Sequence, residues 1–245
     1  MEIRIFDGAE AGALEAAARI AARITARPDA AIAVPTGLTP VTTYRHLVEA
    51  HRAGRLDLGR VRWFALDEFF GVPETHPGSF RRWLMERLIR PAGLDPALLF
   101  SLRGDAPDPG AEAAAYDARI RDVGGLDLAV LGVGRNGHLA FNEPGTEPDS
   151  PTGIRRLTEA TRQANAYLFP RGGVPTHGLS MGLGTLAAAR GLLLIATGAS
   201  KADAIQAMAR PSTTVAACPA ALLRDHPAAA VLADREAAVA LQVVA

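Results

Sequence analysis

Short apolar runs alternate with longer helical patterns along almost the whole chain. Each run is rich in Val, Ile, Leu or Ala and suits a strand buried on both faces of a sheet. Strands that alternate with helices form parallel sheets, because each crossover returns the chain to the same end of the sheet. We therefore predict an α/β fold: an open, mainly parallel sheet with helices on both faces, as in a Rossmann-like three-layer sandwich. The predicted strands are residues 2–6, 30–34, 61–66, 126–131, 178–181, 192–197 and 228–232.

Capping and punctuation residues divide the rest of the chain into helices and loops. Asp7, Thr39 and Ser200 are candidate N-caps, and Pro40 follows Thr39 at the expected first helical position. A Pro- and Asp-rich connection is expected over 94–108. No internal repeat or linker is visible, so residues 1–245 are predicted to form one domain, with a lid-like loop at 145–156. The predicted helices are residues 9–25, 40–53, 80–89, 111–123, 159–169, 183–189, 202–209 and 219–224.

The segment LDLAVLGVGRNGHLAFNEP, residues 126–144, places four polar side chains directly after a buried strand. Gly132, Gly134 and Gly137 match the spacing of the dinucleotide-binding fingerprint. That motif must open a regular helix, however, and the following FNEPGTEPDSP cannot sustain one, so we reject a dinucleotide site. An imidazole in a turn rich in hydrogen-bonding groups is better interpreted as an oriented acid/base group. The polar side chains are Asn136, His138, Asn142 and Glu143.

Three other strand ends carry residues that packing alone does not explain. The strand ending at Val34 runs into PTGLTP, where a helix N-terminus offers free amide groups to an anion or simply caps a βα connection. Asp67 follows the strand 61–66, and carboxylates are rarely buried without a partner. Lys201 lies in the first turn of a predicted helix, where it opposes the helix dipole unless it faces a bound anion. Since all these positions lie at one rim of a parallel sheet, where ligands bind, we expect one site there.

The overall composition excludes several classes of protein. Lys+Arg and Asp+Glu both number 26, which argues against a nucleic-acid or polybasic membrane surface. Cys218 is the single cysteine, so no intramolecular disulfide can form and a reducing compartment is expected. The segment MEIRIFDGAE is not a secretory signal, and no apolar run reaches the roughly 20 residues of a membrane helix. We expect a cytoplasmic protein with no membrane partner, and with no metal or cofactor, since no Cys/His ligand cluster is present.

Six blocks of sequence together resemble the glucosamine-6-phosphate deaminase family. The related 6-phosphogluconolactonases share the fold and the strand–Gly–His turn, but they look different after the His, where this chain has LAFNEP. The resemblance implies isomerisation of an amino-sugar phosphate with deamination, in which glucosamine 6-phosphate and water give fructose 6-phosphate and ammonia. The blocks are PTGLTPVTTYRHL, LDEFFG, HPGSF, GVGRNGHLAFNEP, TRQAN and GASKADAIQ.

Carried over by position, the resemblance assigns a role to each candidate residue. Asp67 would move a proton between C2 and C1 of the substrate, and His138 would open the sugar ring. Asn136 and Glu143 would hold His138. The phosphate-binding residues would be Thr36, Gly37, Leu38, Thr39 and Lys201.

Two positions depart from the family pattern. The family commonly has an Arg in the lid loop and another in the next helix, where this chain has Pro151 and Tyr167. Other arginines could replace them, and the sequence alone does not choose among Arg155, Arg156, Arg162 and Arg171.

Three alternatives to the main hypothesis stay open. The substrate could be another amino-sugar phosphate such as galactosamine 6-phosphate. The protein could instead be a 6-phosphogluconolactonase-like hydrolase, or a sugar-phosphate sensor without activity. Some family members are hexamers and others monomers, so a homo-oligomer also stays open.

Overall fold

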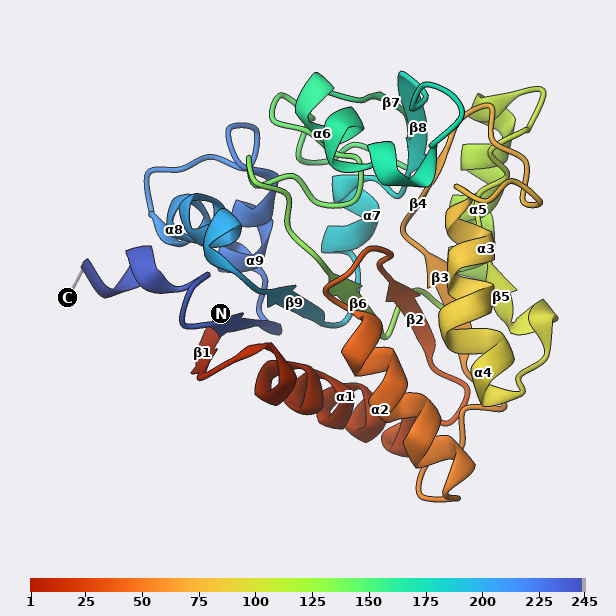
Figure 1. Ribbon diagram of the computed structural model, residues 1–245, viewed down its shortest axis with the longest axis horizontal. Coiled ribbons are helices and arrows are strands. Elements are labelled where there is room, and N and C mark those ends of the chain that lie inside the picture. Colours follow the sequence, from red (N-terminus) through yellow and green to blue (C-terminus); the bar gives the residue numbers. More distant parts are fainter. Residues whose placement is uncertain (244–245) are drawn as a thin grey trace.

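The computed structural model, which describes residues 1–243, has a seven-stranded sheet at its centre (Figure 1). Every pair of neighbouring strands in this sheet runs parallel. In spatial order the strands are β1 (Glu2–Phe6), β10 (Ala229–Asp234), β9 (Leu192–Ala196), β6 (Leu128–Leu131), β2 (Ala31–Val34), β3 (Arg62–Ala65) and β5 (Leu99–Phe100).

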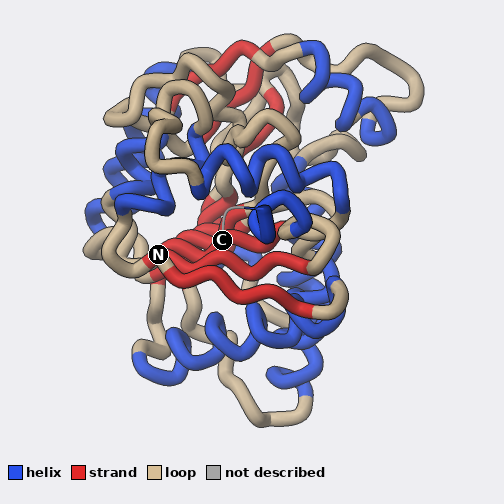
Figure 2. The backbone as a smooth tube through the Cα atoms, turned by 90° about the vertical axis from the view of Figure 1, so that its left-hand side faces the viewer, coloured by secondary structure: helices blue, strands red, loops and turns tan. Residues whose placement is uncertain are grey.

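Helices cover both faces of this sheet, which confirms the predicted three-layer α/β fold (Figure 2). Alternate strand residues point to opposite faces. Ile32 and Val34 of β2 pack among α1, α2 and α3, whereas Ala31 and Ala33 pack among α5, α7, α8 and α9. The helices of the first face are α1 (Ala9–Ala26), α2 (Val41–Arg52), α3 (Phe80–Leu84), the π-helical η1 (Met85–Ile89) and α4 (Arg90–Ala92). Those of the second are α5 (Pro109–Asp122), α7 (Leu183–Ala187), α8 (Ala202–Ala209) and α9 (Leu222–Asp225).

The order of the strands places a topological switch point beside β2. The chain runs from β2 to β3 and β5 on one side, and then returns to lay β6 and β9 on the other. The connections that leave β2 and β6 therefore diverge, and a crevice opens between them at the carboxyl ends of the strands, where open α/β sheets bind ligands.

A second, antiparallel sheet stands above this rim, and the sequence did not predict it. It consists of β4 (Asp67–Phe69), β8 (His177–Ser180) and β7 (Gly153–Arg156), in that order. Phe69, Phe80, Phe141 and Phe169 form its apolar core. Next to it lie α6 (Glu159–Ala164) and the 3-10 turn η3 (Ala166–Leu168).

Several predicted boundaries were wrong. The expected loop at 94–108 contains β5, and the last four residues of the loop at 145–156 form β7. The predicted helix over 80–89 continues as far as Ala92, and its second half is π-helical before Pro91. The remaining 3-10 turns are η2 (Pro96–Leu98), η4 (Ala199–Lys201), η5 (Pro219–Ala221) and η6 (Val239–Val243).

None of the three predicted N-caps is made. Gly8 is the N-cap residue of α1, and Asp7 pairs with Arg235 instead. Pro40 is the N-cap residue of α2, which leaves Thr39 one position too early for its side chain to cap the helix. A 3-10 turn precedes α8, so that Lys201 rather than Ser200 holds the N-cap position.

Candidate active site

The turn after β6, residues 132–143, is called the His138 turn, and its glycines make room for the imidazole. A Cβ atom on Gly134 would lie 2.1 Å from His138 Nδ1. Gly137 has a φ of 83°, a left-handed value that favours glycine, and a Cβ there would lie 2.3 Å from Cys218 Sγ. The turn can therefore close around His138 only when these two positions lack side chains.

Asn136 and Glu143 hold the His138 ring from one side. The Oδ1 atom of Asn136 lies 2.8 Å from His138 Nδ1, and Asn136 Nδ2 donates to Glu143 Oε2 at 2.7 Å. Glu143 Oε2 also lies 3.5 Å from His138 Nδ1. Because these acceptors favour a proton on Nδ1, they leave Nε2 as the nitrogen for proton transfer. The structure thus brings together three of the four polar residues that the sequence singled out in this turn, whereas the Asn142 side chain donates to the carbonyl oxygen of Met181 and to Ser180 Oγ instead.

Glu143 is a buried carboxylate that accepts hydrogen bonds from several neighbouring side chains. Burial alone would raise the pKa of this carboxyl group, but hydrogen bonding to His138, Thr161 and Asn136, together with the charge of His138, lowers its pKa to about 2. The hydroxyl groups of Thr158, at the N-cap of α6, and of Thr161 both donate to Glu143 Oε1. A permanently ionised Glu143 therefore connects the His138 turn to α6 and can stabilise a protonated His138.

Asp67 is the first residue of β4, on the strand that leaves the central sheet for the second sheet. Its exposed fraction is 7%. Burial, and secondly the neighbouring Glu68, raise the pKa of the Asp67 carboxyl group to about 8, and no hydrogen bond from a described residue opposes the rise. Asp67 is therefore a poorly solvated carboxyl group that changes charge near neutral pH, which is a property of catalytic bases.

Ser180 brings Asp67 to the His138 turn. It is the register partner of Asp67 in β8, and its hydroxyl oxygen accepts hydrogen bonds from Phe141 N at 3.1 Å and Asn142 Nδ2 at 3.3 Å. Glu68 points to the opposite face of β4, where its carboxylate accepts hydrogen bonds from Ser79 Oγ and the amide group of Phe80. The two neighbouring acids thus lie on opposite faces of β4, and Glu68 anchors the start of α3.

Residues 36–39 expose unpaired backbone amide groups at the end of β2. None of these amides donates a hydrogen bond to another described residue, and Gly37 has a φ of 95°. The segment leads directly into α2, whose dipole favours an anion at this end. The sequence left two interpretations of this segment open, an anion site and an ordinary βα connection, and the free amide groups support the anion site. Leu38 is 81% exposed and contributes only its amide group.

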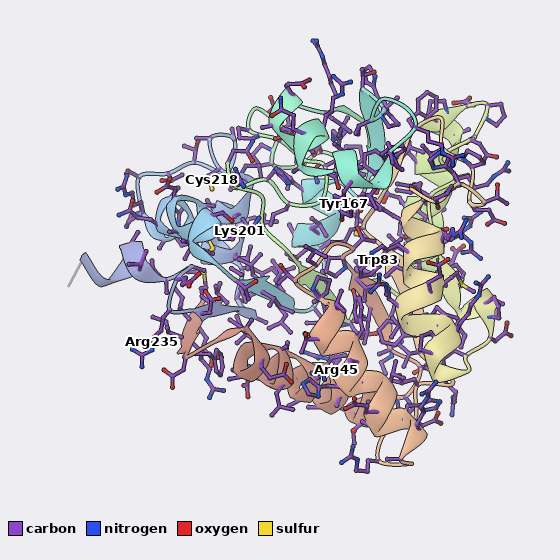
Figure 3. The ribbon with its side chains drawn as sticks, in the orientation of Figure 1. Arg45, Trp83, Tyr167, Lys201, Cys218 and Arg235 are labelled. Atoms are coloured by element: carbon purple, nitrogen blue, oxygen red, sulfur yellow. The ribbon has the colours of Figure 1, made fainter. Side chains whose placement is uncertain are left out.

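Lys201 follows β9 and lies half-buried at the start of α8 (Figure 3). Burial, and secondly the charge of Arg135, lower the pKa of its amino group. A half-buried amino group without a carboxylate partner among the described residues is well placed to bind an anion.

Two of the four arginines that could replace the missing ones at Pro151 and Tyr167 are bound to protein acceptors. Arg155 donates to Asn142 Oδ1 and to the carbonyl oxygen of Pro151, and Arg162 donates to the carbonyl oxygen of Val174. Figure 3 shows Tyr167 on the segment after α6, above Trp83, and its exposed fraction is 57%. The other two candidates, Arg156 and Arg171, are exposed.

Sequence reasoning missed Thr158, Thr161 and Ser180 at this site. Thr158 could have been found, because a Thr before a helical pattern is a capping signal. The role of Ser180 depends on pairing with a strand more than a hundred residues away, for which no local signal exists.

Two negative findings apply to the described part of the chain. Within residues 1–243, no three His, Cys, Asp or Glu side chains gather so that they could hold a metal ion. None of the helices described is long and apolar enough to cross a membrane.

Comparison with known proteins gives a consistent result over the whole chain. Residues 7–233 match the family described as glucosamine-6-phosphate isomerases/6-phosphogluconolactonase. The glucosamine-6-phosphate deaminase of Mycolicibacterium smegmatis is 43% identical, covering 100% of this chain and 94% of the relative. The enzyme of the same name from Pseudarthrobacter chlorophenolicus is 41% identical, over 99% of this chain and 93% of the relative.

Solved structures agree with the sequence matches. A protein described as a monomeric glucosamine-6-phosphate deaminase superposes with a TM-score of 0.94 at 35% identity, covering 98% of this chain and 100% of its own. The 6-phosphogluconolactonase of Trypanosoma cruzi has a TM-score of 0.78 at 20% identity, over 98% of this chain and 96% of its own. The second likeness concerns the fold alone.

Proposed function

The chain belongs to the family of glucosamine-6-phosphate isomerases and 6-phosphogluconolactonases, and we propose that it is a glucosamine-6-phosphate deaminase. In this reaction glucosamine 6-phosphate and water give fructose 6-phosphate and ammonia. The observation that carries the proposal is the buried Asp67 carboxyl group, with a pKa of about 8, on a strand whose register partner Ser180 is hydrogen-bonded to the turn that orients His138.

His138 serves the first step, which is opening of the sugar ring. A proton must leave the hydroxyl group on C1, and another must reach the ring oxygen as its bond to C1 breaks. The imidazole can take the first proton and deliver the second through Nε2, while Asn136 and Glu143 hold Nδ1. The ionised Glu143 stabilises the imidazolium that exists between the two transfers.

Asp67 serves the isomerisation. In the open-chain aldehyde, the carboxylate removes the proton from C2, and the electron pair forms the C1–C2 double bond of an enolamine. The C1=O1 π electrons move onto O1, which takes up a proton from solvent and becomes a hydroxyl group. Return of the proton to C1 leaves an imine at C2, which water attacks to form a carbinolamine. Loss of ammonia then gives the ketone. A carboxylate with a raised pKa is a stronger base than an exposed one, which suits abstraction from carbon.

Hydrolysis of a lactone would not use the Asp67 carboxylate. Lactone hydrolysis needs a base that activates water, which His138 could provide, but it needs no base for a carbon-bound proton. The buried Asp67 therefore supports the deaminase over the lactonase.

The test is to incubate the protein with glucosamine 6-phosphate and to measure ammonia and fructose 6-phosphate together. We expect equal amounts of the two products. Galactosamine 6-phosphate and 6-phosphogluconolactone serve as competing substrates under the same conditions. Faster turnover of the first would change the sugar assigned, and acid release from the lactone without ammonia from either amino sugar would refute the deaminase proposal.

A further inference from the structure

The proposed function leaves the charge of the phosphate group incompletely matched. A sugar phosphate carries close to two negative charges at neutral pH, and Lys201 supplies one positive charge. The family's usual arginine is replaced by the exposed Tyr167. Arg155 and Arg162 are bound to protein acceptors. Arg156 and Arg171 are exposed, and no contact between described residues places either of them at this rim. The candidates for a second cation are therefore the residues that follow the strands of the central sheet.

Arg135 occupies the place in the fold where that cation is needed. It lies in the His138 turn, directly after β6, and β6 stands between β9 and β2 in the central sheet (Figure 1). The turn after β9 carries Lys201, and the turn after β2 exposes the amide groups of residues 36–39. Because the carboxyl ends of neighbouring parallel strands meet at one rim, Arg135 lies in the connection between the two proposed halves of the anion site.

Among residues 1–243, no acid neutralises Arg135. Its side chain is exposed, and no hydrogen bond or ion pair between described residues includes it. It is nevertheless near enough to Lys201 for its charge to lower the pKa of the lysine amino group. Two cations that repel each other in the free protein would both be stabilised by a dianion bound between them.

We propose that Arg135 binds the substrate's phosphate group together with Lys201 and the amide groups of residues 36–39, in place of the arginine absent at Tyr167. This inference rests on the proposed function for the identity of the substrate. Arg135 is a binding residue and touches no reacting carbon, so its removal weakens binding while the chemical steps proceed.

The experiment compares Arg135→Ala with Arg135→Lys and with Arg121→Ala, a control that removes an exposed charge at the C-terminal end of α5. Binding of inorganic phosphate is measured by titration calorimetry at fixed ionic strength, which keeps charge screening constant. KM and kcat for glucosamine 6-phosphate are measured in parallel. We expect Arg135→Ala to weaken phosphate binding and raise KM about tenfold or more, with little change in kcat. Arg135→Lys should be intermediate and Arg121→Ala unchanged.

The two readouts separate this inference from the proposed function. If Arg135→Ala binds phosphate and substrate as the wild type does, the role of Arg135 is refuted even where the wild type releases ammonia. An equal loss in Arg121→Ala would refute it too, because the effect would then reflect net charge alone. If phosphate binding depends on Arg135 but the wild type makes no fructose 6-phosphate, the anion site stands and the deaminase proposal falls.

Discussion

Replacing Asp67 by Asn should make the protein more stable and nearly inactive at the same time. The Asp67 carboxyl group has an ordinary pKa of 3.8 and a folded-state pKa of about 8. Between these values the folded protein holds one more proton than the unfolded chain, so stability falls as pH rises. The loss is about 1.4 kcal/mol per pH unit, or up to about 4 kcal/mol by pH 7. An amide stays neutral and avoids this loss.

The same substitution removes the base for the carbon-bound proton. We expect turnover to fall by roughly 10²- to 10⁴-fold, which is the usual effect of losing a general base. In the wild type, only the ionised carboxylate can act as the base. The kcat/KM for glucosamine 6-phosphate should therefore rise with pH through a value near 8.

Thermal melts of wild type and Asp67→Asn at several pH values between 4 and 9 provide the assay, together with ammonia release. The gap between the two melting temperatures should be small near pH 4 and widen to roughly 5–10 °C by pH 7. Asp122→Asn, at the exposed end of α5, is the matched control and should follow the wild type. This prediction is wrong if the difference between the two melting temperatures stays the same at every pH, or if Asp67→Asn keeps more than a tenth of wild-type turnover.

Three further substitutions test the rest of the site. His138→Gln should slow ring opening by about 10²-fold or more, and a substrate analogue fixed in the open chain should restore much of the rate; equal damage with both substrates would remove His138 from this step. Glu143→Gln should have a lower free energy of unfolding in urea than wild type above about pH 4.5. This difference should shrink as pH falls toward 2, since the pKa of Glu143 is about 2, and a difference that does not change with pH would contradict the assignment. Tyr167→Arg should lower KM about tenfold by adding a phosphate donor, and an unchanged KM would place the residue outside the pocket.

The sequence was sufficient to predict six of the seven strands of the central sheet and the groups at its rim, but not the two-residue strand β5. Both follow from local patterns: buried strands have short apolar runs, and the ends of parallel strands meet at one edge. Asp67, His138 and Lys201 were found in this way, because each lies in the connection that follows a strand of the sheet. The prediction of their roles rests on the family resemblance and awaits the assays above.

The second sheet could not be predicted, because its strands are short and pair across long separations. β4 has three residues and pairs with β8, more than a hundred residues away. The N-cap predictions failed because the position of a cap also depends on features that the local sequence does not show. Thr39 has the right side chain for an N-cap, but Pro40 takes that position through its backbone angles, which composition does not reveal.

The position of β4 has a consequence for the order in which the protein folds. Strands β2 and β3 and helices α1 to α3 all come from the first 84 residues, and both tryptophans, Trp63 and Trp83, lie in the core that they share with β6, β9 and β10. Asp67 reaches its place only when β4 pairs with Ser180 across a loop of more than a hundred residues, and closure of long loops is slow. A refolding chain would therefore regain its native tryptophan fluorescence before its catalytic base is in position, so that a compact intermediate without activity precedes the native enzyme.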